Sequence, residues 1–210
     1  MRLAELDAVT VDGFGTLVEL ESPVAPLVHA LEERGIDRPA HDVARAFSAE
    51  ASHYRLHAHT GRDDETLATL RRECSAVFLR ELEAPLEPQE FVDAFLSALV
   101  FRPAAGAVEA LAALRSNGLK LAVVSNWDCS LPERLDALGL LGHFDAVVTS
   151  AEAGVPKPDP RAFLLALERL GVRANRALHV GDEEADDRGA HAAGMQFAPA
   201  PLSNAVAALS

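Results

Sequence analysis

The sequence has few cysteines, few basic residues and no long apolar run. Its two cysteines, Cys74 and Cys129, lie far apart and share no metal-ligand spacing. The opening residues 1–12 lack the basic region and apolar stretch of an export signal. No apolar segment approaches the ~20 residues that cross a membrane as a helix. We therefore predict a cytoplasmic protein with free thiols and no membrane contact.

Positive charge is scarce. The chain has 19 Lys and Arg against 32 Asp and Glu, a formal net charge of −13. Nucleic-acid binding depends on clustered basic residues, so this balance argues against a nucleic-acid partner. It does not oppose a small anionic substrate, which needs only local positive charge.

Short β-rich runs alternate with helical segments over most of the chain. The strand candidates are residues 6–12, Lys120–Ser125, Asp145–Ser150 and Ala177–Gly181. Such alternation predicts an α/β fold with a doubly wound, Rossmann-like parallel sheet.

The pattern between the first two strand candidates is helical only. Residues 22–99 carry apolar side chains every three to four positions, interrupted near residues 35–39, 61–64 and 85–88. These interruptions divide the segment into four helices. We predict a core of residues 1–18 and 101–210, with an inserted four-helix cap domain over residues 19–100.

Polar side chains stand at or just after the ends of the predicted strands. They are Asp12, Ser125, Lys157, Asp182 and Asp186. Because the carboxyl ends of parallel strands meet at one edge, these groups should converge there. A carboxylate nucleophile with a cation and a hydroxyl suits attack on a phosphoryl group, or on a carbon with a good leaving group. Mg²⁺, held by Asp12 and Asp182, would offset the repulsion between the acids and an anionic substrate.

Four ordered segments carry a resemblance to a known family. They are Asp12-Gly-Phe-Gly-Thr-Leu17, Ser125-Asn126, Lys157-Pro-Asp-Pro-Arg-Ala-Phe163, and Gly181-Asp-Glu-Glu-Ala-Asp-Asp-Arg-Gly-Ala190 with Ala193-Gly-Met195. Together they resemble the motifs of the haloacid dehalogenase superfamily over most of residues 6–197. The helical insert is similar to the cap of that family.

The resemblance implies a set of roles. Asp12 becomes covalently attached to the substrate, Ser125 and Lys157 hold the transferring group, and water releases the product. With them we assign Asn126 and Thr16 to substrate binding. Magnesium would be held by Asp12, Asp182, Asp186 and the backbone carbonyl of Phe14. Asp187 is the alternative to Asp186, and Glu183 is a candidate outer group.

One position departs from the phosphatase pattern of the family. Phosphatases usually carry a second Asp two residues after the nucleophile as general acid and base, whereas this chain has Phe14. General acid–base catalysis contributes about 10²–10⁴-fold. Alkyl phosphates should therefore be poor substrates unless another group supplies the proton. An aromatic residue here also resembles the dehalogenase branch, although that branch lacks the carboxylate that Asp182 provides.

Three functional hypotheses follow. We expect a magnesium-dependent phosphatase acting on a small phosphorylated metabolite through an aspartyl-phosphate. The alternatives are a hydrolase similar to 2-haloacid dehalogenases and a non-catalytic, anion-binding member of the same fold. The sequence predicts neither the substrate nor the oligomeric state.

Several residues keep a second interpretation. Ser125 could cap the following helix, and Trp127 could shape the entrance or only pack. His53, Tyr54, Arg55 and His57 could contact substrate from the cap. The i, i+4 spacing of His53 and His57, near His59, also allows a metal site.

Overall fold

A five-stranded parallel sheet forms the centre of the molecule, with the order β5-β4-β1-β6-β7. The computed structural model describes residues 5–209, so the predicted core limits at residues 1–4 and 210 lie outside the described residues. The strands are β1 (Ala8–Val11), β4 (Lys120–Ser125), β5 (Ala146–Thr149), β6 (Ala177–Gly181) and β7 (Gln196–Pro199). The first four confirm the predicted strands. The sequence analysis missed β7, because this edge strand is only half-buried and lacks a continuous apolar run.

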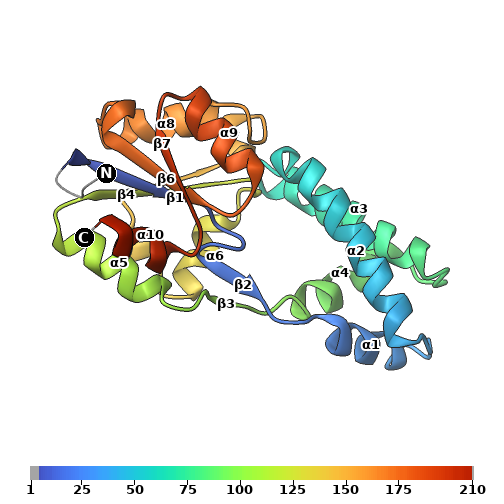
Figure 1. Cartoon of the computed structure of the whole chain (residues 1–210). Coiled ribbons are helices and arrows are strands. Elements are labelled where there is room, and N and C mark those ends of the chain that lie inside the picture. Colours follow the sequence, from blue (N-terminus) through green and yellow to red (C-terminus); the bar gives the residue numbers. More distant parts are fainter. Residues whose placement is uncertain (1–4, 210) are drawn as a thin grey trace.

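Helices cover both faces of the sheet (Figure 1), which confirms the predicted α/β fold class. The helices α5 (Ala107–Ser116), α6 (Leu131–Ala137) and α10 (Leu202–Leu209) pack on one face. The short α7 (Ser150–Ala153) leads into α8 (Arg161–Leu170), which covers the other face with α9 (Glu184–Ala192). Side chains of β1 alternate between the two layers: Val9 and Val11 join one apolar cluster and Ala8 the other. Short 3₁₀ helices span Ala58–Thr60, Leu141–His143 and Ala174–Arg176.

Four helices follow the first strands, as predicted. They are α1 (Val24–Glu32), α2 (Ala40–His57), α3 (Asp64–Glu81) and α4 (Pro88–Ser97). The N-terminus of α3 is capped because the Asp63 carboxylate accepts the Thr66 backbone N–H at 2.9 Å. The four helices enclose an apolar cluster of their own, centred on Phe78 and Phe91.

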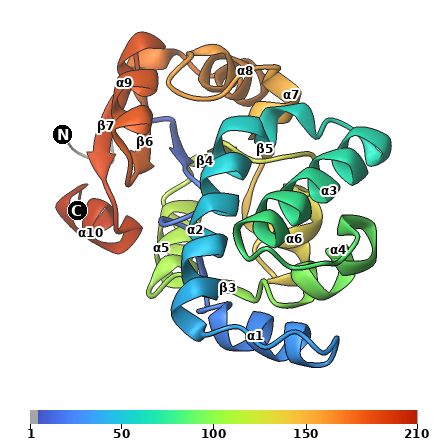
Figure 2. The same ribbon diagram turned by 90° about the vertical axis from the view of Figure 1, so that its right-hand side faces the viewer.

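A two-stranded antiparallel ribbon connects this helical unit to the sheet. It pairs β2 (Val18–Leu20) with β3 (Phe101–Pro103). Three-residue strands are too short for a periodic pattern, so the sequence analysis missed both. The predicted boundaries after residues 18 and 100 fall at this ribbon, and the division into core and cap stays a prediction. Figure 1 shows the helical unit beyond one end of the sheet, and in Figure 2, seen from that side, α2 and α3 stand in front of the sheet. Within residues 5–209, no helix is both long and apolar enough to cross a bilayer.

The strand order places a ligand crevice beside β1. The chain runs from β1 to β4 and β5 on one side, then returns to β6 and β7 on the other. Ligands of doubly wound sheets bind beyond the carboxyl ends of the strands where the order reverses. Residues that follow β1, β4 and β6 therefore occupy the expected position.

Removing the central ring of the helical unit tests its packing. Phe78 is fully buried, with ring centroids 5.8 Å from Phe91 and 5.2 Å from Phe95. We expect Phe78→Ala to lower the free energy of unfolding by about 3–5 kcal/mol in urea titrations, because it leaves a cavity. Leu56→Ala, at a residue that is 68 % exposed, serves as the control and should change it by less than about 0.5 kcal/mol. Equal effects would contradict a close-packed helical core.

Candidate active site

Asp12 follows β1 directly and lies between the ends of two neighbouring strands. Its backbone N–H donates to Val180 O of β6 at 2.9 Å, and the residue is 5 % exposed. The loop then turns at Gly15, which has a φ of +83°. A Cβ on Gly15 would lie 2.3 Å from Asp182 Oδ2. Glycine therefore lets this loop pass beside a second carboxylate.

The ammonium of Lys157 lies between two buried carboxylates. Its Nζ is 2.5 Å from Asp12 Oδ1 and 2.5 Å from Asp186 Oδ1, and it donates to Val124 O at 3.2 Å. The Lys157 backbone N–H donates to Asn126 Oδ1 at 2.7 Å. Asn126 thus holds the loop that carries the lysine, and its predicted substrate contact stays a prediction.

Burial and opposite charge compete in this cluster. Burial alone would lower the pKa of the Lys157 ammonium, but the charges of Asp12 and Asp186 raise it above its usual value. Burial would raise the pKa of Asp186, yet the hydrogen bond from His179 and the charge of Lys157 hold it below its usual range. Lys157 and Asp186 are therefore both charged at neutral pH.

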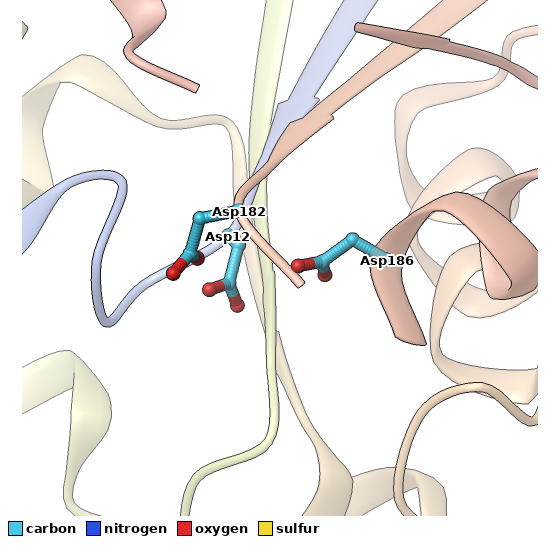
Figure 3. Close-up of side chains that lie close together, drawn as sticks. All are labelled: Asp12, Asp182 and Asp186. Carbon is cyan, nitrogen blue, oxygen red and sulfur yellow. The ribbon is translucent and has the colours of Figure 1, made fainter. Parts of the chain in front are cut away.

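Three carboxylates face one another at this edge of the sheet (Figure 3). Asp12, Asp182 and Asp186 each offer an oxygen within 4.8 Å of the others. Asp182 is the exposed member, and Thr16 Oγ1 donates to its Oδ1 at 3.3 Å. Partial burial, and then the charges of Asp12 and Asp186, raise the pKa of Asp182. In the described chain, Lys157 is the one ammonium paired with this cluster, and it pairs with Asp12 and Asp186.

The donor set fits a hard divalent cation. Mg²⁺ prefers oxygen ligands, commonly carboxylates completed by water and phosphate oxygens. A divalent charge would also relieve the repulsion that raises the pKa of Asp182. Asp12, Asp182 and Asp186 would hold the ion. The predicted contribution of the Phe14 carbonyl stays a prediction, and its ring is 40 % exposed and lines the adjoining cavity.

Asp186, rather than its neighbour Asp187, lies in the cluster. Asp186 is fully buried, and its Oδ2 accepts the Glu183 backbone N–H at 3.1 Å. Asp187 instead lies along α9, with its Oδ1 2.7 Å from His191 Nδ1. A Cβ on Gly181 would lie 2.4 Å from Asp186 Cγ, so glycine makes the close approach of this carboxylate possible. Glu183 caps α9 and turns outward.

His179 is a site residue that the sequence analysis did not identify. Its ring is fully buried in β6, with Nε2 3.1 Å from Asp186 Oδ1 and Nδ1 2.8 Å from Thr10 Oγ1. Burial lowers the pKa of His179, so the ring is neutral, donates from Nε2 to the carboxylate and accepts from the threonine hydroxyl. The only signal in the sequence was a histidine inside an apolar strand two residues before Gly181.

Ser125 ends β4 and is 2 % exposed. A Cβ on Gly13 would lie 2.8 Å from Ser125 Oγ, which places the hydroxyl against the loop that follows Asp12. The following helix, α6, begins only at Leu131, with Ser130 at its N-cap. The helix-capping interpretation of Ser125 is therefore wrong.

A cavity of about 340 Å³ separates this edge from the helical unit. Asp12, Ser125 and Lys157 lie on its core side. Much of the remaining wall is apolar and includes Phe14, Phe47, Phe95, Phe101 and Trp127. Trp127 was expected either to shape the entrance or only to pack. It lines the cavity and also packs against Phe101, with ring centroids 5.4 Å apart.

Two contacts connect α2 to the core beside the cavity. Tyr54 Oη donates to Asp128 Oδ2 at 2.8 Å, and Arg55 pairs with Glu183 at 3.4 Å. Both Tyr54 and Arg55 line the cavity. Their contact with a substrate stays a prediction.

The histidines of the helical unit do not form a comparable site. His53 and His57 stack with ring centroids 4.2 Å apart, and His57 Nδ1 lies 2.8 Å from His53 O. Among the described residues, the three aspartates are the one group of His, Cys, Asp or Glu close enough to share a metal. Cys74 and Cys129 are free thiols, as predicted, and burial raises the pKa of Cys129.

The fold and the site define a Rossmann-like α/β protein with a buried charged cluster at the carboxyl edge of its sheet. The chain belongs to the haloacid dehalogenase-like hydrolases, because the model of that family matches residues 6–194. The resemblance inferred from the four motifs is thereby confirmed.

Three known proteins show the extent of the likeness. Haloacid dehalogenase-like hydrolase domain-containing protein 3 of Bos taurus is 44 % identical over 128 residues, covering 59 % of this chain and 51 % of that protein. Phosphoserine phosphatase of Thermus thermophilus is 40 % identical over 127 residues, covering 57 % and 51 %. The structure of L-2-haloacid dehalogenase from Xanthobacter autotrophicus aligns with a TM-score of 0.67 and 27 % identity, covering 92 % and 77 %. The chain spans about half the length of the first two of these proteins.

Removing the buried ammonium tests the electrostatics of the cluster. With a chelator present, we expect Lys157→Met to lower the free energy of unfolding by about 3–5 kcal/mol at pH 7, because two carboxylates lose their partner. The loss should shrink as pH falls, since the variant raises the folded-state pKa of these acids above the unfolded value and protonation then favours folding. Arg176→Met, which breaks the exposed pair with Asp7, is the control and should cost at most about 1 kcal/mol. A pH-independent loss would contradict the electrostatic explanation.

Proposed function

We propose that this protein is a magnesium-dependent phosphatase that acts on a small phosphorylated metabolite. The observation that carries the proposal is the cluster of Asp12, Asp182 and Asp186, whose oxygens lie within 4.8 Å of one another around a single ammonium. A site with surplus negative charge binds an anion well only when a cation joins it. The relative named phosphoserine phosphatase supports the same reaction class.

Each residue of the site has a role in this proposal. Asp12 attacks phosphorus and forms an aspartyl-phosphate, which water then hydrolyses. Lys157 holds Asp12 through Oδ1, which leaves the other carboxylate oxygen for attack, and it offsets negative charge on the phosphoryl oxygens. The Ser125 hydroxyl, Asn126 and Thr16 bind and orient the phosphoryl group. Bound magnesium would supply further charge stabilisation for that group.

Phe14 makes dehalogenation the main alternative. A halide leaves without a proton, so an aromatic residue at this position does not hinder that reaction, and a dehalogenase structure aligns over 92 % of the chain. Against it, a neutral carbon electrophile has no use for the acidic pair formed by Asp182 and Asp186. The charge of the site therefore favours a phosphoryl substrate.

A non-catalytic, anion-binding protein is the other alternative. The absence of an acid at Phe14 motivates it. However, holding Lys157 buried between two carboxylates carries a desolvation penalty that a simple anion site does not require. We therefore favour catalysis, on a small-molecule substrate and in the cytoplasm.

The nucleophile can be tested directly. Asp12→Asn should reduce hydrolysis of p-nitrophenyl phosphate on the order of 10³-fold or more, because a neutral amide is a poor nucleophile. Asp187→Asn makes the same chemical change at an acid directed away from the cluster, and it should keep the wild-type rate. A folded, fully active Asp12→Asn protein would disprove the assignment.

The reaction class can be tested with two substrates and a chelator. We expect magnesium-dependent release of phosphate from p-nitrophenyl phosphate, abolished by EDTA, and no chloride release from 2-chloropropionate. Chloride release that persists in EDTA would favour the dehalogenase alternative. Binding of inorganic phosphate without turnover of either compound would favour the anion-binding one.

A further inference from the structure

The proposed reaction needs a proton donor for the leaving oxygen, and the Phe14 ring has no proton to give. In an in-line displacement, the leaving oxygen stands on the opposite side of phosphorus from the attacking oxygen. Asp12 attacks from the core side of the cavity. A donor therefore belongs on the opposite wall, which the helical unit supplies.

Glu50 lies on that wall. It is in the middle of α2, is 5 % exposed and lines the same cavity as Asp12. Tyr54 follows one turn later on the same face of the helix. Because Tyr54 donates to Asp128 at 2.8 Å, this face of α2 is held against the loop that follows β4.

Glu50 differs from Asp128 and Glu183, two other acids that line the cavity from its core side. Asp128 accepts hydrogen bonds from Tyr54 and Ser130, and Glu183 is exposed and paired with Arg55, so both have polar partners. Glu50 is buried, and its hydrogen bond is with the Cys74 thiol. Burial raises the pKa of Glu50 to about 7, so a large fraction carries a proton at neutral pH.

Other titratable and charged groups line the same cavity as Glu50. They are Asp12, Tyr54, Arg55, Arg71, Cys74, Asp128, Arg134, Lys157 and Glu183. From α4, only the apolar Phe95 and Leu96 face the cavity. The cavity thus holds a carboxylic acid able to donate a proton across from the nucleophile.

We propose that Glu50 is the general acid and base of this enzyme, supplied by α2 instead of by the loop after the nucleophile. The inference rests on the phosphatase function proposed above. As an Asp12 oxygen bonds to phosphorus, the ester P–O bond breaks and its electron pair stays on the leaving oxygen. That oxygen takes the Glu50 proton and departs as an alcohol. The Glu50 carboxylate then accepts a proton from the water that attacks the aspartyl-phosphate, which releases inorganic phosphate and restores Asp12.

The dependence of rate on the leaving group tests this role. Glu50→Gln should lower kcat/KM for 2-phenylethyl phosphate by about 10²-fold or more, because an alkoxide leaves only with a proton. For p-nitrophenyl phosphate, kcat/KM should stay within about threefold of wild type, because it reports the steps up to release of nitrophenolate, which leaves without a proton. The kcat for this ester should fall, because hydrolysis of the aspartyl-phosphate loses its base. Glu73→Gln, at an exposed acid next to Cys74 but outside the cavity, is the matched control. It should keep both rates.

The pH profile provides a readout that a structural role would not change. With wild-type protein, kcat/KM for the alkyl ester should fall as pH rises above about 7, because only protonated Glu50 donates. This alkaline limb should disappear in Glu50→Gln. Adding Phe14→Asp should shrink the effect of Glu50→Gln on the alkyl ester, since an acid at that position supplies the proton instead.

The possible outcomes distinguish a failure of the Glu50 role from a failure of the proposed phosphatase function. Equal losses of kcat/KM on both esters, an unchanged alkaline limb, or a wild-type protein that hydrolyses only the aryl ester would each overturn the role of Glu50. Such results would leave the phosphatase function standing. Absence of magnesium-dependent hydrolysis of either ester would overturn the function itself. Thermal melting confirms in each case that the variant is folded.

Discussion

The buried ammonium of Lys157 is the interaction on which the rest of the site depends. Its Nζ joins the loop after β1 through Asp12, the end of β4 through Val124 O, and the start of α9 through Asp186. Either carboxylate would be unfavourable in this buried position without a partner, and so would the ammonium. The three charges are stable only together, and their mutual attraction fixes the relative position of three segments that are distant in sequence.

Several features of the surrounding structure make that arrangement possible. The strand order brings β4 and β6 to either side of β1, so the three chain segments end at one edge. Glycines at positions 15 and 181 remove side chains that would collide with the carboxylates. The neutral His179 ring donates a hydrogen bond to Asp186, and Thr10 donates one to the other ring nitrogen of His179. Asp182 remains outside this compensation. Partial burial, and then the charges of Asp12 and Asp186, raise its pKa, and the site retains the surplus charge that suits a divalent cation.

The sequence predicted most of the strands of the central sheet but not the ribbon that connects it to the helical unit. Long apolar strands such as Lys120–Ser125 and Ala177–Gly181 were predictable because each needs burial on both faces. The strands β2, β3 and β7 were not, since they depend on pairing partners more than on their own residues. Asp12 and Asp182 were predictable from their places at strand ends, and Lys157 from its place in a loop that follows a strand. Glu50 and His179 were not, because their importance arises from burial and from neighbours distant in sequence.

The cavity has two walls with different electrostatic character, and this difference organises the proposed chemistry. The core wall is charged and built around Lys157, whereas the helical wall is largely apolar and carries a carboxylic acid at Glu50. A proton donor on the helical wall reaches the substrate only while α2 is docked by its contacts from Tyr54 and Arg55. Proton transfer then depends on closure of the insert over the substrate, and closure also excludes water. An acid in the nucleophile loop would be in place whether the insert is docked or not. In the proposed reaction, Phe14 together with Glu50 would therefore tie cleavage of the ester bond to the docked arrangement of α2.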